Sequence, residues 1–184
     1  MKFIKTAIHD IFIIEPSVLG DQRGYFLESF NLEKFEEHIY PIKFIQDNES
    51  KSSKGVLRGL HFQIPPFDQA KLVRCVDGRV MDVVVDIRIG SPTYGSHLAV
   101  ELSGENKKQL FVPRGFAHGF FVLSEYAVFS YKVDNNYAPA FEAGIKYNDN
   151  DLNINWRFSD QEVQLSEKDK KLPSFKDFNS PFKF

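Results

Sequence analysis

The stretch VMDVVVDI, residues 80–87, decides the fold class of this chain. Its odd positions from 81 to 87 are all apolar, whereas its even positions include Asp82 and Asp86. Such alternation predicts a half-buried β-strand, because successive side chains of a strand point to opposite faces of a sheet. Other short segments rich in β-branched and aromatic residues are predicted as strands on the same grounds. They are residues 11–14, 25–30, 56–63, 72–76, 98–102 and 126–133.

Turn and helix signals complete the predicted organisation. Turn residues separate the strands at intervals of about 8–12 residues, which is typical of an antiparallel sandwich or barrel. Helix is scarce: Asn31 is expected to cap a short helix that reaches Ile39 and is ended by Pro41, and another helix is expected to start at residues 166–169. The Asn- and Asp-rich segment 148–155 is predicted to be a loop. We expect one domain over residues 1–184, with a C-terminal tail.

The composition of the 184 residues excludes several classes of protein. Lys and Arg number 23 against 25 Asp and Glu, a net charge of −2, so a nucleic-acid or anionic-membrane partner is not expected. No apolar run approaches the roughly 18 residues of a membrane span, and the N-terminus lacks a secretion signal. The single cysteine, Cys75, cannot form an internal disulfide. We therefore expect a cytoplasmic protein.

His61 and His118 are the two histidines with patterned surroundings. His61 lies in VLRGLHFQ, residues 56–63, where strict alternation places Arg58 on the opposite face, unless Gly59 introduces a bulge. His118 ends PRGFAH, residues 113–118. The residue types alone leave two interpretations open for each histidine, a hydrogen-bonded core residue and a functional group.

A metal site is the first functional hypothesis. The spacing Pro-x-Gly-x-x-His at residues 113–118 is similar to the second motif of cupin barrels, whose histidine often binds a metal. The first cupin motif has two histidines one residue apart, but here His61 is followed by Phe62 and Gln63. Two histidines without a third ligand make a poor zinc or iron site, so no metal is expected. Cys75, at the end of an apolar strand, is interpreted as a small buried residue rather than a nucleophile.

Proton transfer is the remaining chemistry. An imidazole is the natural general base near neutral pH. Lys71, at the start of an apolar strand, has the charge to stabilise a negative oxygen, and Tyr131 has a proton to give. A snorkelling lysine and a core tyrosine stay open as structural alternatives for these two residues.

Several strings stand in order along the chain: GDQRGYFLE (20–28), QDN (46–48), GVLRGLHFQ (55–63), KLVRC (71–75) and PRGFAHG (113–119). Together they resemble the dTDP-4-dehydrorhamnose 3,5-epimerase family. The resemblance runs in order, with near-matching spacing, from about residue 3 to about residue 173. Any one string is weakly specific, whereas the ordered set is highly specific.

The resemblance implies an all-β, cupin-type double-stranded β-helix (jelly roll) with a few short helices and no metal or cofactor. It implies a homodimer in which the partner subunit contributes an N-terminal strand and part of the nucleotide pocket. The implied reaction inverts carbons 3 and 5 of dTDP-4-keto-6-deoxy-D-glucose in dTDP-L-rhamnose biosynthesis, which supplies cell-surface polysaccharide.

The resemblance also assigns roles to residues. His61 matches the general base, Tyr131 the proton donor, Asp169 the carboxylate that orients the base, and Lys71 the group beside the keto oxygen. A further set matches positions that hold the nucleotide, its diphosphate or the sugar: Arg23, Glu28, Gln46, Asn48, Arg58, His118, Glu142 and Lys168.

One departure and two alternatives accompany the resemblance. Many relatives carry histidine after Gln-Asp-Asn, whereas this chain has Glu49, whose charge matters for a dianionic diphosphate only if the side chain points inward. One alternative is a single-centre (carbon 3) epimerase or a ketoisomerase on a related nucleotide 4-keto sugar. The other, from a different class, is a non-catalytic sugar- or metal-binding cupin.

Overall fold

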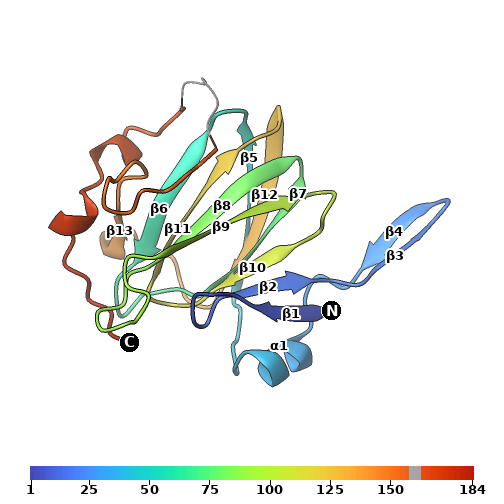
Figure 1. The fold of residues 1–184 in the computed structure, drawn as a ribbon. Coiled ribbons are helices and arrows are strands. Elements are labelled where there is room, and N and C mark those ends of the chain that lie inside the picture. The colour runs from blue at the N-terminus through green and yellow to red at the C-terminus, as the bar shows by residue number, and fades with distance from the viewer. Residues whose placement is uncertain (158–162) are drawn as a thin grey trace.

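Two antiparallel sheets face each other in the computed structural model, which describes residues 1–157 and 163–184 (Figure 1). The larger sheet has the order β1 (Lys2–Lys5), β2 (Phe12–Glu15), β10 (Gln109–Val112), β7 (Lys71–Asp77), β12 (Tyr126–Val133) and β5 (Gln46–Ser53). The smaller sheet has the order β13 (Glu142–Gly144), β6 (Leu57–Gln63), β11 (Phe116–Val122), β8 (Arg79–Asp86) and β9 (His97–Ser103). Strands that are consecutive in the chain alternate repeatedly between the sheets, which makes the fold an all-β jelly roll of the cupin type.

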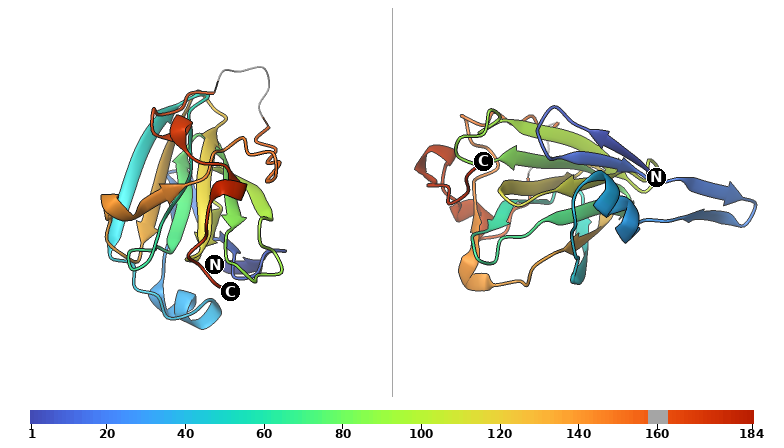
Figure 2. Two further views of the ribbon diagram at one scale, coloured as in Figure 1. Left: turned by 90° about the vertical axis from the view of Figure 1, so that its left-hand side faces the viewer. Right: turned by 90° about the horizontal axis from the view of Figure 1, so that it is seen from below.

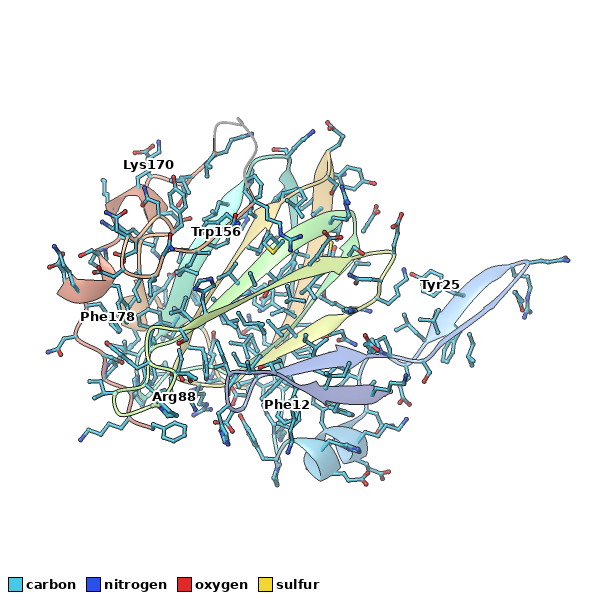
Figure 3. The ribbon with its side chains drawn as sticks, viewed as in Figure 1. Phe12, Tyr25, Arg88, Trp156, Lys170 and Phe178 are labelled. Carbon is cyan, nitrogen blue, oxygen red and sulfur yellow. The ribbon has the colours of Figure 1, made fainter. Side chains whose placement is uncertain are left out.

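The strand β8 is buried on both faces. Val80 and Val84 pack between the two sheets, whereas Met81, Val83 and Val85 pack on the outer face of the smaller sheet. That outer face is covered by apolar side chains of the C-terminal segment, among them Leu152 and Phe182. Trp156 belongs to the same cover (Figure 3). The prediction of a half-buried strand is therefore wrong. The even positions face the interior rather than solvent, so the Asp82 and Asp86 carboxylates are buried at 0% exposure.

All seven segments predicted as strands contain strands, with ends that differ by a few residues. The prediction misses β5, whose sequence QDNESKSS offers no apolar alternation. The interior row of β5 is polar because it lines a cavity, as described below. The prediction also misses β11, which is buried on both faces and whose apolar residues therefore do not alternate with polar ones. The remaining missed strands are β1, β3, β10 and β13.

The predicted N-terminal helix is confirmed as α1 (Leu32–His38). The Asn31 side chain accepts a hydrogen bond from the backbone N–H of Lys34 at 3.2 Å, and Phe35 is fully buried against β2 and β10. The helix expected from residue 166 is only a 3-10 turn, Asp169–Lys171, because Leu172 precedes Pro173 and is therefore extended. Two other 3-10 turns, Pro139–Phe141 and Phe175–Asp177, complete the described helices. Residues 148–155 form the predicted loop.

A bulge interrupts the pairing of β6 with β11. His61 is opposite His118 and Arg58 is opposite Phe120, so two residues of β6 face the single residue Gly119. Gly59, at φ 135°, allows this arrangement: a Cβ built on it would lie 2.5 Å from the Cα of Gly119. The bulge brings Arg58 to the same face as His61, as the sequence allowed.

The hairpin of β3 (Val18–Asp21) and β4 (Gly24–Leu27) projects away from both sheets (Figures 1 and 2). Its apolar side chains lie in the open: Leu19 is 67% exposed and Phe26 69% exposed. An isolated two-stranded hairpin with bare apolar residues is marginally stable in water, so this segment needs a covering surface. Among the described helices, none is long and apolar enough to cross a membrane.

Candidate active site

Two adjoining cavities open between the sheets. The larger, about 370 Å³, is lined mostly by polar side chains: Gln46, Asn48, His61, Phe62, Gln63, Gln69, Lys71, Tyr131, Tyr137 and Glu142. The smaller, about 130 Å³, is lined by Ser50, Arg58, His61, Lys71, His118, Phe120, Phe129 and Tyr131. His61, Lys71 and Tyr131 line both, so these three side chains mark the junction of the two cavities.

His61 is bonded to a buried carboxylate. Its Nε2 lies 2.5 Å from Oδ1 of Asp169, which is 4% exposed. Burial alone would raise the pKa of Asp169, but the hydrogen bond and charge of His61, with further bonds from Ser166 and the backbone of Gly59, lower it. An ionised Asp169 accepts the Nε2 proton, which leaves Nδ1 of His61 as the nitrogen that can take up another proton.

Burial shifts the pKa values of Lys71 and Tyr131 in opposite directions. Burial lowers the pKa of Lys71 to about 8, against the opposing charges of Asp82 and Glu142. Burial raises the pKa of Tyr131, an effect that Arg58 opposes and Glu142 reinforces. At neutral pH the junction therefore presents a cation and a protonated phenol beside the imidazole of His61.

His118 and Arg58 are held by polar partners. Nε2 of His118 lies 2.9 and 3.0 Å from the two carboxylate oxygens of Asp82. Nε of Arg58 donates to Oγ of Ser52 at 3.1 Å. Both side chains line the smaller cavity, which therefore presents the guanidinium of Arg58 and the imidazole ring of His118.

Glu142 connects the cavity to the C-terminal segment. It forms an ion pair with Lys168, and the hydroxyl of Tyr137 donates to it at 2.8 Å. Burial alone would raise the pKa of Glu142, but these two hydrogen bonds lower it below its ordinary value. Across the cavity, the amide of Gln46 donates to Asn48 at 2.7 Å. The walls thus offer several hydrogen-bonding groups to a polar ligand.

A sequence profile of the dTDP-4-dehydrorhamnose 3,5-epimerase family matches residues 5–177. The chain belongs to this family. It is 56% identical to dTDP-4-dehydrorhamnose 3,5-epimerase of Salmonella typhimurium over 174 residues, 94% of each chain. The crystal structure of the enzyme from Elizabethkingia anophelis superimposes with a TM-score of 0.93 at 56% identity, covering 98% of this chain and 99% of that one.

A ligand-bound structure is also similar. It is a dTDP-6-deoxy-D-glucose-3,5-epimerase from Legionella pneumophila in complex with dTDP-4-keto-L-rhamnose. Its TM-score is 0.91 at 49% identity, with coverage of 94% of this chain and 92% of that one. Membership of this epimerase family makes the protein an isomerase.

Most residues that the resemblance assigned to the site line the two cavities of this epimerase-family chain. Lys168 and Asp169 join them from the C-terminal segment through Glu142 and His61. Arg23 and Glu28 do not. Arg23 is fully exposed near the tip of the β3–β4 hairpin, where it pairs with Asp21, and Glu28 pairs with Lys34 of α1. Within one chain these two residues are therefore outside the site.

Glu49 points away from the larger cavity. Along β5, Gln46 and Asn48 line this cavity and Ser50 lines the smaller one, whereas Asp47 and Glu49 are exposed on the other face. The departure from the family pattern at Glu49 thus adds no charge to the cavities of its own chain.

Two further residues are not predicted from the sequence: Tyr137, which lines the larger cavity, and Asp82, which is bonded to His118 behind the smaller one. Asp82 stands out in the sequence as an acidic residue inside a run of Val and Met, a placement that a hydrogen-bonded partner makes tolerable. Tyr137 lies in a loop without periodicity, and no signal in the sequence singles it out. Among the described residues, no group of three or more His, Cys, Asp and Glu side chains is arranged to hold a metal ion.

We expect Asp169→Asn to lower kcat on the order of 10²- to 10⁴-fold, because the amide neither fixes the tautomer of His61 nor stabilises its imidazolium. Steady-state kinetics with the 4-keto nucleotide sugar measures the effect. Glu167→Gln, which removes an exposed carboxylate two residues away, is the matched control and should retain full activity. Equal losses in both variants would contradict the role of Asp169.

The pH profile of kcat/KM should fall as pH rises through about 8, where Lys71 loses its proton. The sign follows from burial, which lowers the pKa of the lysine and makes its cationic form the one lost on the alkaline side. Tyr131 does not account for this fall of kcat/KM at high pH, the alkaline limb of the profile, since burial raises the pKa of Tyr131. In Lys71→Arg, which stays charged at all working pH values, the limb should vanish whatever the remaining rate. A limb near pH 8 in that variant would exclude Lys71 as its source.

Proposed function

We propose that this protein inverts carbons 3 and 5 of dTDP-4-keto-6-deoxy-D-glucose, the reaction of a dTDP-4-dehydrorhamnose 3,5-epimerase. The observation that carries the proposal is the junction of the two cavities, where a carboxylate-bound imidazole, a buried ammonium and a phenol meet. Removal of a proton next to a ketone, stabilisation of the enolate and return of a proton need these three groups.

The first half-reaction uses His61 and Lys71. The keto group at carbon 4 acidifies the hydrogens on carbons 3 and 5. Nδ1 of His61 takes the proton from carbon, the electron pair moves onto the keto oxygen, and the ammonium of Lys71 stabilises the enolate. Asp169 stabilises the imidazolium that forms.

The second half-reaction uses Tyr131. Its phenol gives a proton to the same carbon from the opposite face, which collapses the enolate to the ketone and inverts the centre. Exchange with solvent then removes the proton from His61 and restores that of Tyr131. Because burial raises the pKa of Tyr131, the phenol is protonated before each turnover.

The nucleotide part of the substrate requires a dimer in this proposal. Arg23 and Glu28 match nucleotide-binding positions of the family but lie outside the cavities of their own chain. The projecting hairpin carries Arg23 near its tip and bears exposed apolar residues, as a segment exchanged between subunits would. We therefore propose a homodimer in which each hairpin completes the nucleotide pocket of the partner. The cytoplasmic location expected from the sequence stays a prediction.

A single-centre epimerase is the second candidate. It needs the same base and the same enolate stabiliser, so these residues do not separate the two activities. Tyr131 favours inversion over ketone isomerisation, because only inversion calls for a donor on the opposite face. A non-catalytic sugar-binding cupin is disfavoured by the buried carboxylate of Asp169 against His61, because burying a carboxylate costs desolvation free energy that sugar binding alone does not require.

Incubation of the substrate in heavy water tests the proposed reaction. We expect NMR to show deuterium at both carbon 3 and carbon 5, since each centre loses a proton to His61 and regains one equilibrated with solvent. Deuterium at carbon 3 alone would overturn the double epimerisation. Tyr131→Phe should still exchange protons but form little inverted product, whereas full product formation would overturn the assignment of Tyr131 as donor.

Phe26→Asp should convert the proposed dimer to a monomer and weaken dTDP binding at least tenfold, because it places a charge on the apolar hairpin. Sedimentation measures the first effect and calorimetric titration with dTDP the second. Ile89→Asp, at another exposed apolar residue, is the control and should change neither. A monomeric wild-type protein that binds dTDP through Arg23 would contradict the exchanged hairpin.

A further inference from the structure

Asp82 is a buried carboxylate that the proposed mechanism does not use. It lies at the centre of β8, is 0% exposed, and points between the two sheets. In the part of the chain that the structure describes, His118 is the one side chain that hydrogen-bonds to it. A carboxylate is costly to bury, and the strand offers no other reason for an acidic residue here.

The other buried carboxylate of the same strand shows what a purely structural role looks like. Asp86 accepts hydrogen bonds from the Arg88 guanidinium, from Ser91 and from Thr93, and Arg88 also binds Asp10. This network connects β8 to the loop that follows it and to the N-terminal segment, away from both cavities. Asp82, by contrast, directs its negative charge toward groups that line the smaller cavity.

Asp82 lies behind His118 as seen from the smaller cavity, and so behind the junction of the two cavities. On β11, His118 pairs with His61 of β6 on one side, and Phe120 pairs with Asp82 of β8 on the other. The two oxygens of Asp82 bond one ring nitrogen of His118, so the ring is held with its other edge toward the smaller cavity. The site thus contains two His–Asp pairs. One is His61 with Asp169, which includes the proposed base, and the other is His118 with Asp82, on the neighbouring strand.

Lys71 lines the same smaller cavity as His118, and Asp82 is bonded to His118 behind that cavity, so the negative charge of Asp82 favours the ammonium form of Lys71. Burial lowers the pKa of Lys71 to about 8, and the charges of Asp82 and then Glu142 oppose this lowering. The other titratable groups that face Lys71 come from several elements. They are Arg58 and His61 from β6, His118 from β11, Tyr131 from β12, Tyr137 beside Glu142 and, behind His61, Asp169. Without Asp82, Lys71 would keep only Glu142 as an identified stabilising anion.

We propose that Asp82 is a positioning residue for the electrophilic side of the site: it orients His118 and keeps the ammonium of Lys71 charged for stabilisation of the enolate. Asp82 acts through these two residues and does not line either cavity. The inference rests on the role of Lys71 in the proposed function.

The test is the pH profile of kcat/KM in Asp82→Asn, which keeps the size of the side chain and an oxygen acceptor but removes the charge. We expect the midpoint of the alkaline limb to move from about pH 8 to about one unit lower. At pH values above 8 this shift corresponds to roughly a tenfold loss of kcat/KM relative to the wild type. At pH 6.5 the loss should be several-fold smaller. Affinity for dTDP, measured by calorimetric titration, should stay unchanged.

Asp86→Asn is the matched control, because it makes the same change at a buried residue of the same strand. It should lower the melting temperature but leave the alkaline limb in place. Asp82→Asn combined with Lys71→Arg should show no limb, because arginine stays charged without the carboxylate. A folded Asp82→Asn with an unmoved limb would overturn the inference.

Two further variants keep the outcomes distinct. An active Lys71→Met enzyme would contradict the proposed role of Lys71 itself, whereas an inactive Lys71→Met with an unmoved limb in Asp82→Asn would contradict only the role of Asp82. If Asp82→Asn does not fold, His118→Gln serves instead. It leaves the charge of Asp82 in place, so the limb must remain near pH 8, and a displaced limb would assign the titration to His118 and overturn the inference.

Discussion

The close approach of Gly59 to Gly119 is the constraint on which the site depends. A regular pairing of β6 with β11 would place Arg58 and His61 on opposite faces of the smaller sheet. The extra residue of the bulge rotates the strand between them, so that both side chains face the interior. The same bulge supplies the backbone hydrogen bond of Gly59 that helps hold Asp169 ionised. No side chain larger than hydrogen fits at either glycine, since Cβ atoms there would lie within 3.0 Å of the facing backbone.

The C-terminal segment covers the smaller sheet and supplies the carboxylate that binds His61. Its apolar residues, Trp156 and Phe182 among them, cover the outer face of β6, β8 and β11, and this cover buries β8 and β11 on both sides. Asp169 belongs to the same segment and enters at the edge of β6, where its carboxylate meets His61. Packing and chemistry are therefore coupled: the residues that exclude water from the sheet also fix the position of the carboxylate that orients the base.

The sequence predicts those parts of the fold in which burial requires apolar residues at regular intervals or in runs along the chain. The seven segments with apolar alternation or β-branched runs all contain strands, and Asn31 marks the start of α1 through its side-chain cap. Where the interior is itself polar, this logic fails. The sequence does not predict β5, because its inward residues are polar and face a cavity, and it predicts β8 as half-buried because the interior acids of β8 resemble a solvent-exposed face. The meeting of His61 with Asp169, 108 residues apart, depends on tertiary packing that no local pattern encodes, and only the resemblance to the family placed them together.

The register of β5 explains why Glu49 is compatible with a site for a dianionic ligand. Inward and outward side chains alternate along the strand, so Gln46 and Asn48 face the larger cavity while Asp47, Glu49 and Lys51 are exposed. β5 is also the edge of the larger sheet, and among the described strands only β12 pairs with it. Charged side chains on such an edge discourage indiscriminate pairing with other chains. A glutamate at position 49 thus adds charge where an edge strand benefits from it and leaves the charge of the cavities to Arg58, Lys71 and the carboxylates near Lys71.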